Sequence, residues 1–275
     1  ENTFTKHNPD IIFHVAAYKH VPIVENNITE AITNNVLGTK NLVTLALKFK
    51  IQNFTLISTD KAVRPTNIMG ATKRLAELLI HAISKSKELN TNNINFSIIR
   101  FGNVLGSSGS VVPLFYKQIN EGGPITLTDE KMTRYFMTIR EAAILVLQST
   151  LLQSDNEIFV LDMGMPIKIL DLAKKMIKLS GLTEKNKDNP NGNIEIKITG
   201  LRPGEKLYEE LIVDNNMKKT DRPHILKARE KIVKYNEIIE LIDEISNFAE
   251  SSDIRKIKSI LMNEIIGYRP KDNEV

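Results

Sequence analysis

Apolar residues in the first hundred positions follow two patterns that alternate along the chain. Short runs rich in β-branched and aromatic residues are typical of buried parallel strands, and they occur at Ile11–Val15, Phe54–Ser58 and Phe96–Arg100. Between these runs, apolar residues at helical spacing predict helices over Ile28–Phe49 and Asn67–Leu89. Because strands and helices alternate, we expect an α/β fold with right-handed crossovers and a doubly wound, Rossmann-like parallel sheet.

The pattern becomes mixed after Arg100, where the Gly- and Ser-rich segment Gly102–Gly109 predicts a loop. Downstream, we expect strands at Ile125–Leu127, Glu157–Asp162 and Ile194–Ile198, and helices at Val111–Asn120, Ile139–Leu152, Ile169–Ser180, 205–213 and 233–264. The predicted division is a sheet-based part over residues 1–103 plus 137–165, and a smaller interleaved α/β part over residues 104–136 plus 166–275.

Composition excludes several classes of protein. The 275 residues are 41% apolar and 25% charged, as in ordinary globular proteins, and the net charge of +4 comes from lysines interleaved with acids. A nucleic-acid partner is therefore not expected. The absence of Cys excludes disulfides, thiolate metal sites and a Cys nucleophile, and the five His lack metal spacing. Apolar runs stay well below the roughly 18 residues that span a bilayer, and we expect a cytoplasmic protein.

The sharpest chemical signal follows the second predicted strand. Thr59, Asp60 and Lys61 come directly after it, and Lys73 follows Met69 by one turn of the next helix. Open α/β sheets bind ligands at the carboxyl ends of their strands, and an adjacent acid and base could serve general acid–base chemistry. The alternatives are an exposed ion pair and an ordinary surface lysine.

Three further segments are candidates for binding. The small residues in Ala16-Ala17-Tyr18-Lys19-His20 follow the first strand and would let a flat cofactor approach the backbone; tight packing is the alternative. Backbone N–H groups of the Gly-rich segment Arg100–Pro113 suit phosphate. In the turn Gly200–Lys206, Arg202 suits a diphosphate and Glu205 suits ribose hydroxyls, unless Glu205 only caps the turn.

Two more polar residues lie within predicted elements. His14 lies inside the first strand, and we expect a satisfied core histidine rather than a ligand. Asn34 and Asn35 lie in a helix although Asn is a weak helix former. One of them could hydrogen-bond across to the next strand, and a solvated face is the alternative.

Taken together, these motifs resemble the extended short-chain dehydrogenase/reductase superfamily and, within it, the CapD-like nucleotide-sugar 4,6-dehydratases of polysaccharide biosynthesis. The matching segments run in family order through most of the chain: Ala16–Val21, Asn35–Thr39, Ser58–Lys61, Met69–Lys73, Arg100–Pro113, Met132–Thr138 and Arg202–Leu207. The Thr-Asp-Lys triplet distinguishes the dehydratases from related epimerases and reductases.

The resemblance implies an NAD-dependent, redox-neutral dehydration of a UDP-sugar, in particular UDP-N-acetylglucosamine, to a UDP-4-keto-6-deoxy sugar. It implies catalytic roles for Thr59, Asp60, Lys61, Met69 and Lys73. The implied cofactor contacts are Ala16, Ala17, Tyr18, Asn35, Ser58, Lys73 and Arg100. The implied substrate contacts are Lys19, His20, Asn103, Val112, Thr126, Arg134, Arg202 and Glu205. No metal is implied, and a homo-oligomer is expected.

The chain departs from the family pattern in two ways. It starts at Glu1 without the strand and Gly-rich turn that hold the cofactor pyrophosphate, so we expect the first βα units to be missing. Upstream sequence could also carry a membrane attachment. Met69 replaces the Tyr that usually takes the proton of the sugar 4-hydroxyl, as in the subgroup that acts on UDP-N-acetylglucosamine. A UDP-sugar 4-epimerase and an inactive NAD- and UDP-sugar-binding fragment are the alternatives.

Overall fold

The computed structural model describes residues 1–86, 88–91, 93–152, 158–212, 217–230 and 233–270. The chain divides into two compact units. The first comprises Glu1–Phe101, Leu145–Asp162 and the described residues from Glu210 onward, and the second comprises Gly102–Ile144 and Met163–Glu209.

The first unit is built on a six-stranded, mostly parallel sheet with the strand order β1-β2-β3-β8-β13-β12. The first four of these strands run parallel, whereas β13 and β12 are antiparallel additions. The strands are β1 (Ile11–His14), β2 (Asn53–Thr59), β3 (Asn95–Phe101), β8 (Ile158–Leu161), β13 (Ile225–Ala228) and β12 (Met217–Lys219). The doubly wound, Rossmann-like fold expected from the alternating pattern is confirmed.

Strand β1 forms one edge of this sheet in the described part of the chain. Its inner edge pairs with β2, from Ile11 beside Asn53 to His14 beside Leu56. On one face, the side chains of Ile11, Phe13 and Val15 are 47%, 37% and 63% exposed. A parallel strand is normally covered on both faces, so β1 presents an apolar, uncovered face together with an open backbone edge.

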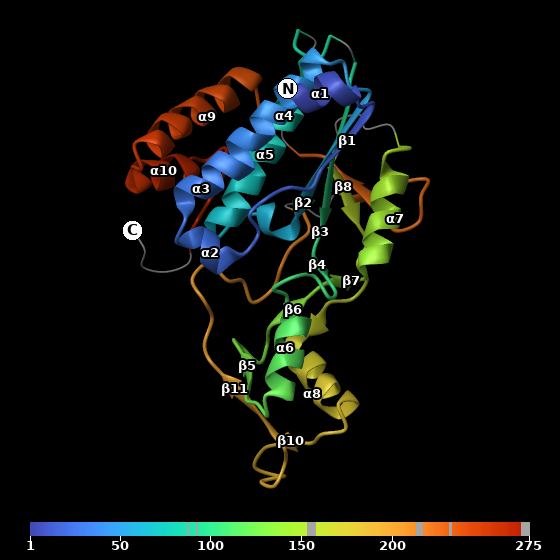
Figure 1. Ribbon diagram of the computed structural model, residues 1–275, viewed down its shortest axis with the longest axis vertical. Coiled ribbons are helices and arrows are strands. Elements are labelled where there is room, and N and C mark those ends of the chain that lie inside the picture. Colours follow the sequence, from blue (N-terminus) through green and yellow to red (C-terminus); the bar gives the residue numbers. More distant parts are fainter. Residues whose placement is uncertain (87, 92, 153–157, 213–216, 231–232, 271–275) are drawn as a thin grey trace. The chain divides into compact units, whose positions relative to one another are not determined.

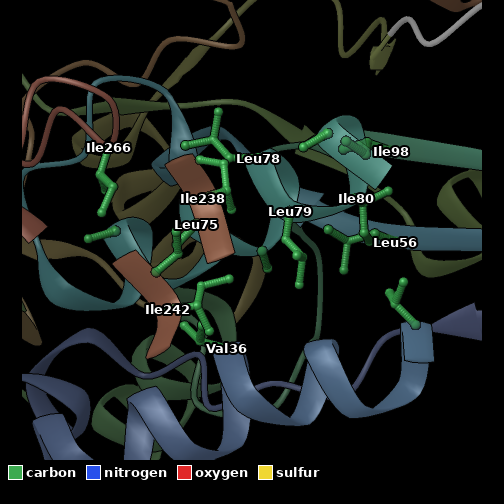
Figure 2. Packing of buried hydrophobic residues seen from close by; sticks show 14 of the residues in the cluster. Val36, Leu56, Leu75, Leu78, Leu79, Ile80, Ile98, Ile238, Ile242 and Ile266 are labelled. Atoms are coloured by element: carbon green, nitrogen blue, oxygen red, sulfur yellow. The ribbon is translucent and has the colours of Figure 1, made fainter. Parts of the chain in front are cut away.

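Helices α4 (Gly38–Lys48), α5 (Ile68–Lys85) and α9 (Tyr235–Glu250) lie on one side of the sheet (Figure 1). α5 is buried along most of its length, and Figure 2 shows its Leu75 beside Ile238 and Ile242 of α9. The α5 N-terminus is capped by Asn67, whose Oδ1 accepts a 2.8 Å hydrogen bond from the Gly70 N–H. This capping fixes where the helix starts relative to the end of β2.

The predicted helix Ile28–Phe49 is one continuous helical segment with an irregular centre. It consists of α3 (Ile28–Ala31), a π-helical stretch η1 (Ile32–Leu37) and α4. The remaining helices of the first unit are α1 (Asn2–His7), α2 (Val21–Glu25) and α10 (Ile254–Leu261). Helix α7 (Ile139–Ser149) joins the two units in sequence.

The second unit has its own parallel sheet, in the order β10-β11-β5, and its own apolar core. Its sheet strands are β5 (Ile125–Leu127), β10 (Glu184–Lys185) and β11 (Ile194–Ile198), and its helices are α6 (Val111–Asn120) and α8 (Ile169–Leu179). Two short strand pairs complete it: β4 (Asn103–Val104) with β7 (Phe136–Met137), and β6 (Thr133–Arg134) with β9 (Ile167–Lys168). Phe115 of α6 and Ile177 of α8 belong to its core.

Two predictions from the sequence are wrong. Residues 205–212 form an irregular segment with bends rather than a helix, and residue 213 lies outside the described residues. The carbonyls of Lys206 and Leu207 accept hydrogen bonds from the Arg134 guanidinium, so they are not available for a helical ladder. The described residues from Glu210 onward belong to the first unit rather than the second, because β13 pairs with β8 and α9 packs on α5.

Strand boundaries elsewhere agree within a few residues, although Glu157 of the predicted strand Glu157–Asp162 lies outside the described residues. In the described part of the chain, no helix has the length and apolar character needed to cross a membrane.

Candidate active site

Thr59, Asp60 and Lys61 form one hydrogen-bonded group where β2 ends. Thr59 Oγ1 donates to Asp60 Oδ1 at 2.8 Å, and Lys61 Nζ lies 3.0 Å from the same oxygen. The Asp60 side chain is fully buried, whereas that of Lys61 is 21% exposed. The exposed ion pair considered from the sequence therefore does not describe this group. Asp60 Oδ2 is buried and has no hydrogen-bond partner among the described residues.

The turn that carries Lys61 is a single 3-10 turn, Asp60–Ala62, whose geometry follows from Thr59. Thr59 is extended and its Oγ1 accepts a hydrogen bond from the Lys61 N–H, so it caps the turn. The turn thereby directs two ionisable side chains to the end of the strand, where ligands bind in open α/β sheets.

Lys73 is buried in α5 and is not a surface lysine. Its Nζ donates a 2.6 Å hydrogen bond to the Ile57 carbonyl of β2, and its side chain lies among core residues. Burial lowers the pKa of Lys73 to about 8, against the opposing effect of the Glu77 carboxylate one turn later. At pH 7 the ammonium therefore remains mostly charged. Met69, one turn earlier, is 3% exposed and cannot titrate.

Gly70 allows α5 to approach the turn that carries Lys61. A Cβ at position 70 would overlap with the Lys61 carbonyl oxygen and crowd Asn67 Oδ1. Because both neighbours are backbone or capping atoms, neither can move without displacing the turn. Gly70 is therefore required by a close backbone approach.

We expect Gly70→Ala to destabilise the protein by about 1–3 kcal/mol through overpacking, and to lower activity by moving Lys61. Gly38→Ala is the matched control, since a Cβ there meets only the Thr33 carbonyl oxygen at 3.8 Å. Alanine should stabilise that helical position by up to about 1 kcal/mol. Thermal unfolding and turnover of both variants test the contrast, and equal behaviour of the two would refute it.

The segment after β1 is held by Asn35, which lies in the π-helical stretch. Asn35 Oδ1 accepts a 2.8 Å bond from the Tyr18 N–H, and its Nδ2 donates to the Tyr18 carbonyl and to Thr72 Oγ1. The sequence suggested a bond to the next strand; the structure instead ties the helix to the segment that follows β1. Ala16, Ala17, Lys19 and His20 flank this anchored residue and remain partly or fully exposed.

His14 is a satisfied core histidine, as expected. Its Nε2 lies 2.8 Å from Thr39 Oγ1, and this hydroxyl donates its own proton to the Asn35 carbonyl. Nε2 must therefore be the protonated nitrogen. Burial, and secondarily the Lys73 charge, lower the pKa of His14 to about 4.

Protonation of His14 should therefore make stability depend on acid pH. The unfolded state takes up a proton below its ordinary pKa of 6.5, whereas the folded state does so only near 4. Stability should decrease by about 3 kcal/mol as the pH falls from 6.5 to 4. Urea unfolding across this range should show a shallower decrease in His14→Gln, and parallel profiles for the two proteins would contradict the assignment.

Arg100 does not have the role expected from the sequence. Its side chain is fully buried, its Nε and Nη2 donate to Glu77 at 2.8 and 2.6 Å, and its Nη1 donates to Glu230 at 2.6 Å. Arg74 also pairs with both carboxylates. The guanidinium is thus committed to a buried ionic cluster rather than to a cofactor. Ser58, also expected to contact the cofactor, is buried, and its Oγ has no hydrogen-bond partner among the described residues.

The second unit contains a cavity of about 160 Å³ that brings together most of the expected substrate-binding residues. They are Asn103, Thr126, Arg134, Arg202 and Glu205. Val112 is not among the lining residues, whereas its neighbours Val111, Leu114 and Phe115 are. The cavity therefore combines apolar walls with two guanidinium groups and a carboxylate.

Arg134 is the most constrained of these residues. Its Nη1 donates to the carbonyls of Thr133 and Leu207, and its Nη2 donates to that of Lys206 at 2.8 Å. Nη2 also lies 3.7 Å from Glu205 Oε1 and 3.9 Å from Glu209 Oε1, so two carboxylates are within ion-pair distance of the guanidinium. In the neighbouring turn, Glu205 Oε2 accepts from the Arg202 N–H at 3.1 Å, so the capping role considered from the sequence is present.

Two residues with clear structural roles were missed. Glu77 pairs with Arg100 and influences Lys73, and its spacing of four residues from Lys73 was a readable signal on a helix. Gln118 of α6 bonds to Thr126 of β5, and a single sequence offers no signal for a helix–strand contact of this kind.

The comparisons with known proteins agree with this fold and these motifs. A family described as polysaccharide biosynthesis protein matches residues 1–230. The capsular polysaccharide biosynthesis protein CapD of Staphylococcus aureus is 53% identical over 76% of this chain and 33% of CapD. The UDP-glucose 4-epimerase of Rickettsia canadensis is 39% identical over 78% of this chain and 59% of that protein.

Among solved structures, the X-ray structure of Pen from Bacillus thuringiensis superposes with a TM-score of 0.72 at 38% identity, covering 82% of this chain and 68% of Pen. The chain spans only about a third of the length of CapD. The resemblance identified from the motifs is confirmed by the family match over most of the chain: it belongs to the polysaccharide biosynthesis protein family, as a CapD-like member of the extended short-chain dehydrogenase/reductase superfamily.

Proposed function

We propose that the protein containing this chain catalyses the NAD-dependent 4,6-dehydration of UDP-N-acetylglucosamine to a UDP-4-keto-6-deoxy sugar. One observation carries the proposal: a buried Asp60 and a partly exposed Lys61 lie 3.0 Å apart where β2 ends. Elimination of water needs an acid for the leaving hydroxyl and a base for the neighbouring carbon. This pair offers both in one place.

The residues around the end of β2 fit a nicotinamide cofactor. Lys73 places a cation beside the Ile57 carbonyl of β2. Ser58 Oγ is a buried polar atom with no hydrogen-bond partner among the described residues. Asn35 fixes the backbone at Tyr18. These residues would hold the nicotinamide ribose. When bound, NAD would supply the reversible hydride exchange that makes the sugar C5 hydrogen acidic and leaves no net redox change.

The Asp60–Lys61 hydrogen bond explains how one site can provide both an acid and a base. An ammonium–carboxylate pair differs from the amine–carboxylic acid pair by one proton moved along the 3.0 Å contact. In the second form, Lys61 takes the C5 proton and Asp60 gives its proton to the departing C6 hydroxyl. Thr59 would hydrogen-bond to the sugar O4.

Met69 leaves the first proton transfer to other groups. Its thioether cannot take the proton of the 4-hydroxyl, and it lies buried one turn before Lys73. We propose that this proton leaves through a water molecule with the help of Asp60 or Thr59, both of which are polar groups at the strand end.

The cavity of the second unit would hold the nucleoside diphosphate. Arg134 and Arg202 offer charged donors suited to phosphate, Glu205 offers a carboxylate for ribose hydroxyls, and Asn103 and Thr126 offer neutral polar groups. Lys19 and His20, on the exposed segment after β1, remain proposed substrate contacts.

A UDP-sugar 4-epimerase is the second candidate, because relatives with 37–39% identity carry the name UDP-glucose 4-epimerase. The experiment is mass spectrometry of the product formed by the full-length protein from UDP-N-acetylglucosamine with NAD. A product lighter by one water supports dehydration. A product of unchanged mass identifies an epimerase, and no turnover with any UDP-sugar identifies a binding protein.

A further inference from the structure

The edge of β5 is closed by a side chain rather than by another strand. In the sheet order β10-β11-β5, β5 is the outer strand among the described residues, so the side of the Thr126 backbone that faces away from β11 pairs with no strand there. Gln118 of α6, which packs beside β5 (Figure 1), makes two bonds there. Its Oε1 lies 3.1 Å from the Thr126 backbone N, and its Nε2 lies 2.7 Å from Thr126 Oγ1.

The backbone bond fixes which way the Gln118 amide points. A peptide N–H can only donate, so the amide atom facing it must be the oxygen. The amide nitrogen therefore faces the Thr126 hydroxyl, and since an amide NH₂ can only donate, Oγ1 must accept. The hydroxyl proton is left to point elsewhere, and within the described residues no acceptor for it is recorded. Thr126 lines the cavity of the second unit.

We propose that Gln118 is a positioning residue that makes the Thr126 hydroxyl a donor into the cavity. The bound ligand must then present a hydrogen-bond acceptor at this point, such as a base carbonyl or a phosphate oxygen. The proposal rests on the proposed UDP-sugar site and adds a rule of polarity to it: a ligand group that can only donate is rejected, because it would meet another donor.

A variant in which the side chain at position 118 accepts the Thr126 hydroxyl proton instead of donating to the hydroxyl, with its shape unchanged, tests this rule. In Gln118→Glu at pH 8, an ionised carboxylate accepts from both the Thr126 N–H and its hydroxyl, which turns the hydroxyl away from the cavity. We expect UDP binding to the full-length protein to weaken by about five- to tenfold. Thr126→Val should weaken it similarly and Thr126→Ser should not. Lys117→Gln is the matched control, because it makes the same change of charge on the adjacent exposed residue and should have no effect.

The double variant separates positioning from charge repulsion. If Gln118 acts through the hydroxyl, Gln118→Glu should cause no further loss in a Thr126→Val background. Titration with uridine and with UDP identifies the acceptor, since only a base or ribose acceptor would retain the effect with uridine. Additive losses of UDP affinity in the double variant would overturn the positioning role of Gln118, and so would UDP binding by Gln118→Glu equal to that of the wild type. Either result would leave the proposed function unaffected. If the wild-type protein does not bind UDP, the proposed function fails and this inference fails with it.

Discussion

Lys61→Ala in the full-length protein should abolish exchange of the sugar C5 hydrogen with solvent and reduce turnover by about 10²–10⁴-fold. The change removes the basic side chain that lies 3.0 Å from Asp60. NAD binding should be retained, because Lys61 is not among the groups proposed to hold the cofactor. The measurement is deuterium incorporation at C5 by mass spectrometry, alongside steady-state rates.

Two further variants make this test specific. Asp60→Asn keeps a side chain of the same shape beside Lys61 but cannot supply the proton for the leaving hydroxyl. The rate of C5 hydrogen exchange should therefore fall less than the rate of product formation. Lys6→Ala removes an exposed lysine of α1 and should change neither quantity. Normal C5 exchange in Lys61→Ala would assign the base to another group.

Arg100→Met should lower the free energy of unfolding of the first unit by about 3–5 kcal/mol, because it leaves buried carboxylates without their partner. Arg100 is fully buried, and although burial alone would lower its pKa, Glu77 and Glu230 outweigh it and raise the pKa. Burial would likewise raise the pKa of Glu230, but Arg100 and Arg74 lower it to about 2. The cluster is therefore charged at all ordinary pH values.

The matched variant is Arg100→Met combined with Glu77→Met. It removes one charge of each sign and leaves the Arg74–Glu230 pair neutral overall. Replacing a buried pair by apolar residues is often close to neutral, so the double variant should be more stable than either single one. Hydrogen exchange of α5 amides measures this locally. Additive losses would show that the charges are not coupled.

The alternating apolar pattern predicted the parallel strands because each is a short run of apolar residues, and it predicted α6 and the strands β5 and β11 to the residue. The apolar pattern gave wrong predictions where contacts with distant segments decide the local secondary structure. Residues 205–212 have enough apolar character for a helix. The carbonyls of Lys206 and Leu207, however, accept hydrogen bonds from Arg134, which lies about seventy positions earlier in the sequence.

The sequence predicted which residues group at the candidate site, but not the role of every residue. Thr59, Asp60 and Lys61 are adjacent in sequence, so their grouping followed from position alone. The family resemblance implied a cofactor contact for Arg100, which ends a strand beside a Gly-rich loop. Its partners are Glu77, 23 positions away, and Glu230, 130 positions away. Pairing over the larger separation leaves no pattern that a single sequence can reveal.

The edge that β1 forms in the described part of the chain has a practical consequence for producing the protein. Its free backbone groups and its exposed Ile11, Phe13 and Val15 together form a template onto which another extended chain can add. Recombinant production of residues 1–275 alone should therefore yield self-associated material.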